Sequence, residues 1–468
     1  MAKINQKNAD YLILGLGQTG LSCARYLARQ SLPFSVMDTR TTPPQLDLFR
    51  HEFPDTPLYL GQLDEQRIMQ ATDVIISPGL DPACLPSLNT TKNRMTPLIY
   101  SDIALFAQAA TAPIIAITGS NGKSTVTCLV GAMLSDAGYR VEVGGNLGRP
   151  ALELLTAPTP DFYVLELSSF QLEMTDHLKP RVAAFLNLSD DHLDRHGTMA
   201  NYQATKQRIY TQCQTAVWNR NEPTTRPAQA CTSLINFGDD PAPTENDFGI
   251  ITQASISWLA RGQQRLLKTH DLKLQARHNW LNALAALAIG QAIQLPLESM
   301  QRTLQTFTGL PHRCEWVAEQ QGVVWINDSK ATNVGATIAA LLGLGTPCPG
   351  RLILIAGGIG KGADFEPLRS PITQFAKAVI LMGQAADLLQ QALSDTVPLT
   401  RVPNLTSAIQ QAHGIAQTGD IVLLSPACAS QDMFKDYADR GNTFKQQVRT
   451  HLQTARVIRL DLEQSTGF

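Results

Sequence analysis

The residues with the clearest chemical meaning lie between positions 112 and 131. A short apolar segment, Ile114 to Ile117, leads into the glycine-rich turn TGSNGKST, and a helix-like apolar run follows. In such a turn, backbone N–H groups close around phosphate oxygens, Lys123 can reach the terminal phosphates, and the hydroxyl of Ser124 or Thr125 can hold Mg²⁺. Ile117 replaces the first glycine of the usual motif, so this is a shortened P-loop. It predicts a site for ATP or a similar triphosphate.

A second glycine-rich turn lies near the N-terminus. Gly15-x-Gly17-x-x-Gly20 separates a predicted strand at 11–14 from a predicted helix at 21–29, and Asp38 ends the next strand. This is the dinucleotide fingerprint, in which the acidic residue binds a ribose hydroxyl of NAD. The same pattern also occurs with other nucleotide ligands, or only for tight packing of a helix on a strand. The P-loop that follows argues against a simple dehydrogenase.

Three further segments between the P-loop and residue 210 carry candidate metal ligands. Glu166 ends an apolar strand and can hold the Mg²⁺ of the nucleotide, although a surface or capping carboxylate is an equal alternative. The segment 190–196, DDHLDRH, matches no zinc spacing, and we favour a helix start capped by Ser189 or Asp190. Lys206 lies in a predicted helix, where spacing alone indicates a solvated side chain.

Polar residues also follow the predicted boundary near residue 310. Arg313 and Lys330 could clamp phosphate, and Asp328 could hold a ribose or a metal. The alternative is a local ion pair, worth ~0–1 kcal/mol if it is exposed.

The composition excludes several classes of protein. The chain has 468 residues and a net charge of −2, with no charged block, which argues against binding to nucleic acid or an anionic membrane. Its eight cysteines are scattered without a Cys-x-x-Cys pair, which favours reduced thiols over disulfides or zinc. The N-terminus shows no signal-peptide pattern, and no apolar run approaches ~20 residues. We therefore expect a cytoplasmic protein without membrane insertion.

The strand and helix pattern predicts an α/β fold of three domains. Strands alternating with helices indicate mostly parallel, doubly wound sheets. We expect a Rossmann-like domain at 1–101, a P-loop domain with a small β region at 102–309, and a second Rossmann-like domain at 310–468. Residues 90–111 are expected to form a connector with a short helix. Further strands are predicted at 34–37, 74–76, 114–117, 162–166, 182–187, 323–326, 352–356, 378–382 and 421–424, a β region within 215–275, and a helix at 280–295.

Taken together, these motifs resemble the Mur ligase family. The resemblance covers nearly the whole chain, and the segment 220–270 adds little to it. It is carried by TGSNGKST, GGNLG, LELSSFQLE, DDHLDR, YQATKQRIY, RHNWLNALAA, FTGLPHR, NDSKATN and SPACAS. The family uses ATP to join an amino acid to a carboxylate in peptidoglycan precursor synthesis. The terminal motifs, including GLGQTG and SPACASQDMFKDYADRGNTF, are similar to those of the member that adds D-glutamate to UDP-N-acetylmuramoyl-L-alanine.

The resemblance implies a mechanism and a set of roles. The substrate carboxylate attacks the γ-phosphate to give an acyl phosphate, and the amine of D-glutamate then attacks the acyl carbon. Lys123, Glu166, His192 and Lys206 are the implied catalytic residues. Two Mg²⁺ ions are implied, with Ser124, Glu166, His192 and a carbamylated Lys206 as ligands. ATP is implied to contact Thr118, Gly119, Ser120, Asn121, Gly122, Lys123, Ser124, Thr125, Asn279, Arg313 and Asp328.

The resemblance also assigns the two other substrates, so the dinucleotide-like turn would hold a uridine nucleotide instead of NAD. Tyr437 departs from the family pattern, which has Phe at this position. Gln18, Thr19, Asp38, Thr39, Arg40, Ser77, Gly79 and Asn146 are implied to bind the UDP substrate. Lys330, Thr332, Lys361, Ser430 and Tyr437 are implied to surround D-glutamate.

The distribution of these roles leads us to expect a monomer whose third domain closes on the second. Three alternatives remain: another amide ligase of the superfamily, a nucleotide-gated binding module, or an NAD-dependent oxidoreductase. Another ligase would use a different amino acid, a binding module would turn over ATP slowly without stimulation by any amino acid, and an oxidoreductase would bind NADH.

Overall fold

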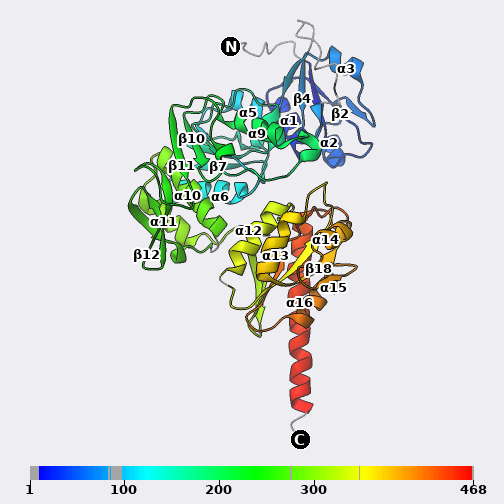
Figure 1. Ribbon diagram of the computed structural model, residues 1–468. Helices are drawn as coiled ribbons and strands as arrows, with labels where there is room; N and C mark the ends of the chain where they lie inside the picture. The colour runs from blue at the N-terminus through cyan, green and yellow to red at the C-terminus, as the bar shows by residue number, and fades with distance from the viewer. Residues whose placement is uncertain (1–9, 83–84, 86–96, 275–276, 347, 466–468) are drawn as a thin grey trace.

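The computed structural model describes residues 10–82, 85, 97–274, 277–346 and 348–465, with side chains described up to Gln453. It contains three sheets, each flanked by helices, in three successive parts of the chain (Figure 1). The predicted α/β fold is therefore confirmed. The exact domain boundaries, 101/102 and 309/310, stay a prediction. Residues 86–96, within the predicted connector, lie outside the described residues.

The N-terminal sheet is parallel, with strand order β3-β2-β1-β4-β5. Helix α1 lies close to β1 because Gly20 has no side chain: a Cβ there would lie 1.9 Å from the Gly15 carbonyl oxygen. The glycine turn thus brings the start of α1 against the end of β1. The elements are β1 (Tyr11–Leu14), α1 (Gln18–Arg29), β2 (Phe34–Asp38), α2 (Leu46–Glu52), β3 (Leu58–Leu60), α3 (Glu65–Gln70), β4 (Asp73–Ile76) and β5 (Leu98–Tyr100).

The central sheet has strand order β14-β13-β12-β11-β10-β9-β6-β8-β7. The pairs from β7 to β12 are parallel, and β12, β13 and β14 add an antiparallel extension, which confirms the β region expected within 215–275. The elements are α5 (Asp102–Ala109), β6 (Ile114–Thr118), α6 (Lys123–Asp136), β7 (Val141–Gly145), β8 (Phe162–Glu166), α7 (Ser169–Glu173), β9 (Val182–Phe185), α8 (Leu193–His196), α9 (Met199–Gln207), β10 (Thr215–Asn219), β11 (Ser233–Phe237), β12 (Phe248–Gln253), β13 (Ile256–Arg261), β14 (Gln264–Lys268), α10 (Arg277–Ala292) and α11 (Leu297–Thr306).

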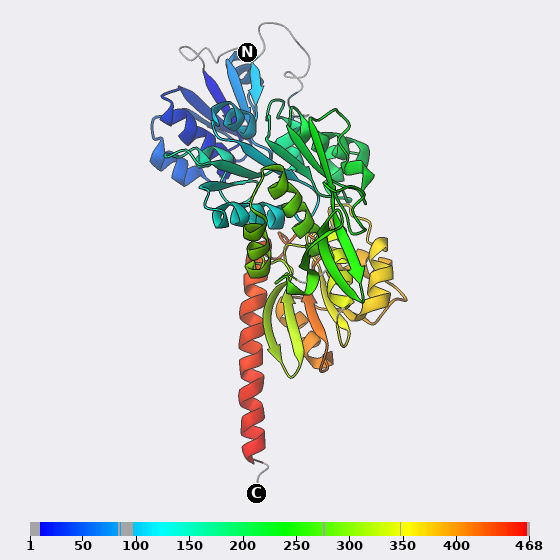
Figure 2. The same ribbon diagram turned by 90° about the vertical axis from the view of Figure 1, so that its left-hand side faces the viewer.

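The C-terminal sheet has order β15-β16-β20-β17-β18-β19, parallel except for the edge strand β15. Helix α16 begins beside this sheet and projects from the body of the protein (Figures 1 and 2). The elements are β15 (Glu315–Gln320), β16 (Val323–Asn327), α12 (Val334–Gly345), β17 (Leu352–Gly357), α13 (Arg369–Phe375), β18 (Ala376–Met382), α14 (Ala386–Ala392), β19 (Leu399–Arg401), α15 (Leu405–Ile415), β20 (Ile421–Leu424) and α16 (Tyr437–Ser465).

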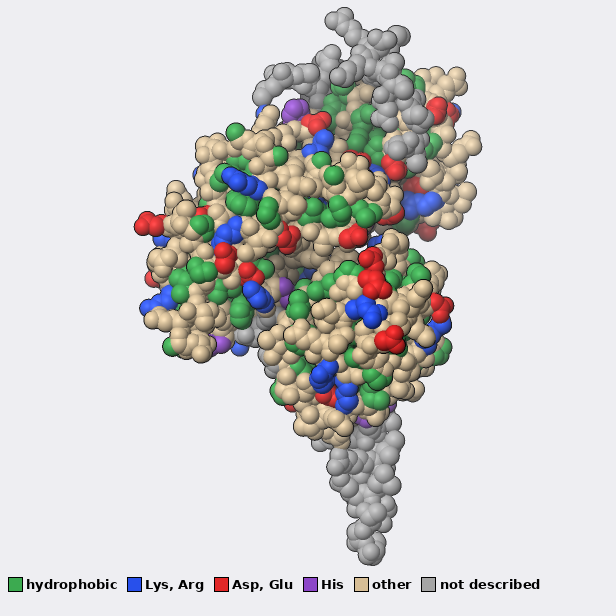
Figure 3. Space-filling view, viewed as in Figure 1, with side chains coloured by type: hydrophobic (Ala, Val, Ile, Leu, Met, Phe, Trp, Pro, Cys, Tyr) green, Lys and Arg blue, Asp and Glu red, His purple; other side chains and the backbone are tan. Residues whose placement is uncertain are grey.

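Buried apolar side chains on both faces of the sheets explain their apolar, non-alternating sequences. On the face shown in Figure 3, acidic and basic side chains are scattered and form no large patch of one sign. Among the described residues, no helix is long and apolar enough to cross a membrane.

Candidate active site

The P-loop connects β6 to α6, as the sequence predicts. Gly122 lies at the N-cap of α6 with φ +78°, and a Cβ there would lie 2.4 Å from the Asn282 side-chain oxygen. Only glycine fits this backbone conformation and this close approach. The loop is held by Asn187, which follows β9: its carbonyl oxygen accepts from Ser120 N at 3.0 Å, and its Oδ1 accepts from Asn121 N at 2.7 Å.

Two lysines converge on the P-loop backbone. Lys123 Nζ donates to the carbonyl oxygens of Gly119 at 2.8 Å and Ser120 at 3.0 Å, and Lys206 Nζ donates to Gly119 O at 2.9 Å. Burial lowers the pKa of both amines, and the Lys123 charge lowers that of Lys206 further. Lys206 is 1% exposed, so its interpretation as a solvated residue is wrong. Helix α9 instead directs it under the loop, above the Tyr202 ring.

Glu166, at the end of β8, is also buried, so a surface carboxylate is excluded. Its Oε1 accepts from Asn146 Nδ2 at 2.7 Å, whereas Oε2 is buried without a hydrogen-bond partner among the described residues. Burial alone would raise the pKa of Glu166, but the Lys123 charge and polar contacts with Ser124 and Asn146 lower it. The site therefore holds an ionised carboxylate with one free oxygen, as binding of a cation requires.

His192 is the N-cap residue of α8, with φ +57°, so the predicted caps Ser189 and Asp190 are wrong. Its Nε2 lies 3.6 Å from Asp191 Oδ2, and its ring packs against Phe170. The pKa of His192 is lowered by burial and by nearby lysines, which include Lys206, although Asp191 opposes the shift. A neutral imidazole results, the form that binds a metal.

The C-terminal unit completes this region. Arg313 Nη2 donates to Ser124 Oγ at 2.8 Å, and Asn333 Nδ2 donates to Asp191 Oδ2 at 3.1 Å. Arg313 thus makes a contact between units instead of the local ion pair considered from the sequence. Asp328 accepts from Cys314 N at 3.1 Å and from Ser425 Oγ at 2.8 Å, and burial raises its pKa to about 6.

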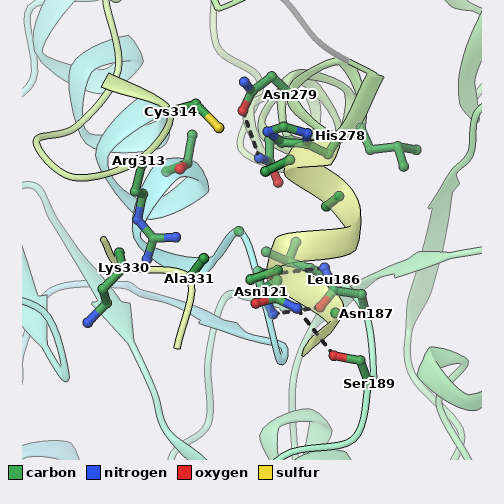
Figure 4. Close-up of a pocket in the computed structure, with 18 of the residues that line it drawn as sticks. Asn121, Leu186, Asn187, Ser189, His278, Asn279, Arg313, Cys314, Lys330 and Ala331 are labelled. Atoms are coloured by element: carbon green, nitrogen blue, oxygen red, sulfur yellow. Dashed lines mark hydrogen bonds between the residues drawn. The ribbon is translucent and has the colours of Figure 1, made fainter. Parts of the chain in front are cut away.

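A cavity of about 290 Å³ lies between the central and C-terminal units, with Arg313 and Lys330 on one side and Asn279 on the other (Figure 4). Six of the predicted ATP residues line it: Asn121, Gly122, Thr125, Asn279, Arg313 and Asp328. The other five predicted ATP residues lie at the end of β6, in the loop and at the start of α6, and are not part of the lining: Thr118, Gly119, Ser120, Lys123 and Ser124.

A second cavity, of about 500 Å³, lies between the N-terminal and central units. The Asp38 carboxylate in its wall is already engaged, because it accepts from Leu16 N at 2.7 Å and from the Arg40 side chain at 2.7 and 2.9 Å. Asp38 therefore stabilises the glycine turn through its hydrogen bond with Leu16 N. All eight residues predicted for the UDP substrate line the cavity: Gln18, Thr19, Asp38, Thr39, Arg40, Ser77, Gly79 and Asn146.

The residues predicted for D-glutamate are less closely grouped. Lys330 Nζ lies 3.7 Å from the centre of the Tyr437 ring, and Thr332 N donates to Lys330 O. Burial and the Arg313 charge lower the pKa of Lys330 to about 8. Ser430 Oγ is buried without a hydrogen-bond partner among the described residues, and Lys361 is close enough to affect the pKa of His192. Of this group, only Lys330 lines the nucleotide cavity.

Sequence reasoning missed two arginines that hold the site together. Arg440, on α16, is fully buried and donates to Ser329 Oγ and Ser329 O, both at 2.9 Å, and to Cys428 O at 3.1 Å. Arg195 donates to Leu80 O at 3.2 Å and to Glu173 at 2.9 Å, which links the N-terminal and central units. Neither residue has a local pattern that distinguishes it from a solvated helical arginine.

Comparison with known proteins agrees with this arrangement. Three domain models match the chain: "Mur ligase MurD-like, N-terminal domain" at 9–99, "Mur ligase middle domain" at 117–290, and "Mur ligase, glutamate ligase domain" at 312–428. The chain belongs to the Mur ligase family.

Relatives in the family extend over nearly the whole chain. Proteins named UDP-N-acetylmuramoylalanine--D-glutamate ligase from Legionella pneumophila (strain Lens) and Nitrosococcus oceani are each 49% identical. The alignments cover 94% of this chain and 98% of the first relative, and 95% of this chain and 97% of the second.

Solved structures share the fold at lower identity. UDP-N-acetylmuramate-alanine ligase MurC from Thermotoga maritima aligns with a TM-score of 0.60 and 16% identity, covering 95% of this chain and 100% of that one. MurF ligase from the same organism, in complex with ADP, gives a TM-score of 0.60 and 15% identity, covering 94% and 98%. The Mur ligase fold thus accounts for all three units.

Proposed function

We propose that this Mur ligase adds D-glutamate to UDP-N-acetylmuramoyl-L-alanine with ATP, through an acyl-phosphate intermediate. The names of the 49% identical relatives support this specificity. The structural observation that carries the proposal is the position of Glu166 and Asn146. Asn146 lines the second cavity, and Glu166, to which it donates a hydrogen bond, lies beside Lys123 and Ser124 of the P-loop site. A carboxylate bound in that cavity would therefore face the nucleotide phosphates.

In this proposal the reaction begins with phosphorylation of the substrate carboxylate. The carboxylate oxygen attacks the γ-phosphorus of ATP and ADP leaves, which turns a poor acyl donor into a reactive one. Lys123 and Arg313 would counter the negative charge that builds up on the phosphates. The amine of D-glutamate then attacks the acyl carbon, and collapse of the tetrahedral intermediate releases phosphate.

The residues present fit Mg²⁺. The buried Oε2 of Glu166 and the hydroxyl of Ser124 are hard oxygen ligands beside the P-loop. His192 is close enough to Lys123 and Lys206 for their charges to lower its pKa. Ser124 and Glu166 would hold a first ion, and His192 and carbamylated Lys206 a second. When bound, these ions neutralise phosphate charge.

Carbamylation of Lys206 fits its surroundings. A neutral amine adds to CO₂ and loses a proton, which gives a carbamate whose single negative charge is shared by two oxygens. Lys206 has no carboxylate partner among its described hydrogen bonds and is instead bonded to Gly119 O and Thr118 Oγ1. Conversion to a carbamate would replace a buried cation next to Lys123 by an anion, so the two side chains would no longer repel each other.

For the UDP substrate we propose the second cavity. Arg40, braced by Asp38, is the cation available for the diphosphate, and Gln18 and Thr19 lie at the start of α1, where backbone N–H groups favour anions. Asn146 would contact the muramoyl-alanine end. The oxidoreductase alternative assigns this cavity to NAD, and a test of NADH binding separates the two.

For D-glutamate we propose Lys330, Thr332, Lys361, Ser430 and Tyr437, with the C-terminal unit closing on the central one when ligands bind. The contacts from Arg313 to Ser124 and from Asn333 to Asp191 support such coupling. Closure would exclude water from the acyl phosphate. Solution scattering curves that stay unchanged when ATP and the UDP substrate are both added would count against it. We further propose a cytoplasmic monomer.

The deciding experiment is phosphate release from ATP and Mg²⁺ with UDP-N-acetylmuramoyl-L-alanine and a panel of amino acids. The proposal requires phosphate only with D-glutamate, together with an equimolar amount of UDP-dipeptide. Turnover with another amino acid would refute the specificity but retain the ligase. ATP binding without turnover by any amino acid would favour the nucleotide-gated module.

A further inference from the structure

Two cysteine thiols, outside the proposed catalytic machinery, lie in contact. Cys213 Sγ lies 3.5 Å from Cys231 Sγ, close to the edge of the apolar core that underlies the central sheet. Among the described cysteines, no other two sulfur atoms are recorded within hydrogen-bonding distance. No local sequence pattern pairs them, because β10 and an irregular connection lie between them.

The sheet itself places these cysteines opposite each other. Thr215 on β10 is the register partner of Ser233 on β11, and the two cysteines each lie two residues before these positions. Backbone hydrogen bonding between the two chain segments already begins just before β10, since Ser233 N donates to Gln214 O at 3.1 Å. Neighbouring strands lie ~4.7–4.9 Å apart, which falls in the Cα range of disulfides, ~4.4–6.8 Å. Side-chain rotation alone would therefore bring the sulfur atoms together.

The two thiols differ in access. Cys213 is 7% exposed, and burial raises its pKa to about 12. Cys231 is partly exposed and lies on the segment that leads into β11. An oxidant from solution therefore reaches Cys231 first, and Cys213 is placed to attack the modified sulfur.

We propose that Cys213 and Cys231 form a reversible intramolecular disulfide, with a small-molecule disulfide of the glutathione class as the oxidant. The Cys231 thiolate attacks one sulfur of the oxidant, forms a mixed disulfide and releases one small thiol. Cys213 Sγ then attacks Cys231 Sγ, and its proton passes to the departing small thiolate, which is released as the second thiol. The two protein thiols are oxidised by two electrons, and the small disulfide is reduced to two thiols.

The disulfide would close a covalent loop of residues 214–230, which contains β10 and most of the connection from β10 to β11. This segment is already tied to α9, because Gln207 Nε2 donates to Thr224 O at 2.9 Å and to Arg226 O at 2.8 Å. Its Glu222 accepts from Leu188 N at 2.7 Å and lines the nucleotide cavity. Because the backbone is in place before oxidation, the disulfide fixes the present arrangement of this segment instead of disrupting it.

The test is disulfide mapping after incubation of the full chain with oxidised glutathione, followed by alkylation and trypsin digestion under non-reducing conditions. We expect one cross-linked species that joins peptides 209–220 and 221–261, with neither cysteine alkylated. We also expect an unchanged rate of phosphate release and a higher midpoint of thermal unfolding. A reducing thiol should reverse both the cross-link and the rise in the midpoint.

The controls separate the pair from general thiol reactivity. Cys213→Ser should leave Cys231 as a stable glutathione adduct, whereas Cys348→Ser, which removes another partly exposed thiol, should still yield the cross-link. The proposal is overturned if wild-type Cys213 stays alkylatable while Cys231 carries glutathione, or if Cys231 pairs with another cysteine. Loss of activity on cross-linking would overturn the inference that the disulfide fixes the present arrangement. Mapping does not depend on catalysis, so failure of the proposed function would not alter it.

Discussion

The buried guanidinium of Arg440 is the basis of our most specific stability prediction. It makes three hydrogen bonds of 3.1 Å or less, to Ser329 Oγ, Ser329 O and Cys428 O, and two longer ones. Arg440→Met retains most of the side-chain volume but leaves these acceptors without a donor. Each unsatisfied buried group costs ~1–3 kcal/mol, partly offset because the cation no longer has to be desolvated. We expect the C-terminal unit to lose ~3–5 kcal/mol of stability.

Urea unfolding followed by hydrogen exchange of segments 323–330 and 421–430 would measure this loss. The matched control is Arg401→Met in the same unit, because Arg401 pairs with Asp387 at the surface, where the two side chains are 52% and 76% exposed. Such a pair is worth ~0–1 kcal/mol. We also expect the KM for D-glutamate to rise more than the KM for ATP in the Arg440 variant, since Lys330 and Ser430 flank the lost contacts. Equal destabilisation by the two substitutions would refute the reasoning.

Predictions for four further residues concern catalysis, substrate binding and stability. Tyr437→Phe keeps the ring under Lys330 and should leave the KM for D-glutamate unchanged, whereas Tyr437→Leu removes a cation–π contact of ~0.5–2 kcal/mol and should raise it ~2–30-fold. The pKa of Lys330 is lowered to about 8, so its positive charge is present below this pH and lost above it; the KM for D-glutamate should rise above pH 8 in the wild type and stay flat with Lys330→Arg. The same shift means that folding favours the neutral amine of Lys330. Its contribution to the free energy of unfolding should therefore increase with pH between about 8 and the pKa of Lys330 in the unfolded chain. Thermal unfolding of the wild type and of Lys330→Arg across this range would reveal the difference. Arg195→Met should raise the KM for the UDP substrate about tenfold through loss of ~1–2 kcal/mol from two contacts: the hydrogen bond to Leu80 O between the units, and the ion pair with Glu173 that orients Arg195. The KM for ATP should stay unchanged, and steady-state kinetics would measure both constants. Glu166→Gln should lower kcat by ~10²-fold or more with folding intact, and a variant that still turned over normally in Mg²⁺ would contradict the proposed metal site.

The sequence predicts those parts of the fold and site whose physical causes are local. The P-loop needs a strand, a glycine turn and a helix in immediate succession, so residues 112–131 identify it directly. Long apolar strands such as β17 and β18 are equally clear. By contrast, β7 contains Glu142 and two glycines and becomes a strand only through its pairing with β8. Local pattern does not distinguish such a segment from a loop.

The positions of the charged site residues depend on tertiary packing instead. Lys206 and Arg440 both lie on helices whose sequences are mostly polar, and polar helix residues are usually solvated. Lys206 is buried because the P-loop backbone covers it, and Arg440 is buried because the loops after β16 and β20 surround it. Only the resemblance to a family assigned Lys206 a role, and neither line of reasoning found Arg440.

The hydrogen bond between Asn146 and Glu166 has a consequence for inhibitor design. It joins the wall of the cavity proposed for the UDP substrate to the carboxylate beside the P-loop. Two fragments of modest affinity, one for each side of this bond, could be connected by a short tether. Their effective local concentration would then reach the millimolar range, and the gain in avidity could be ~10²–10⁴-fold. The tether would have to pass the Asn146 side chain, so the length that gives the tightest binding would report the separation of the two sites in solution.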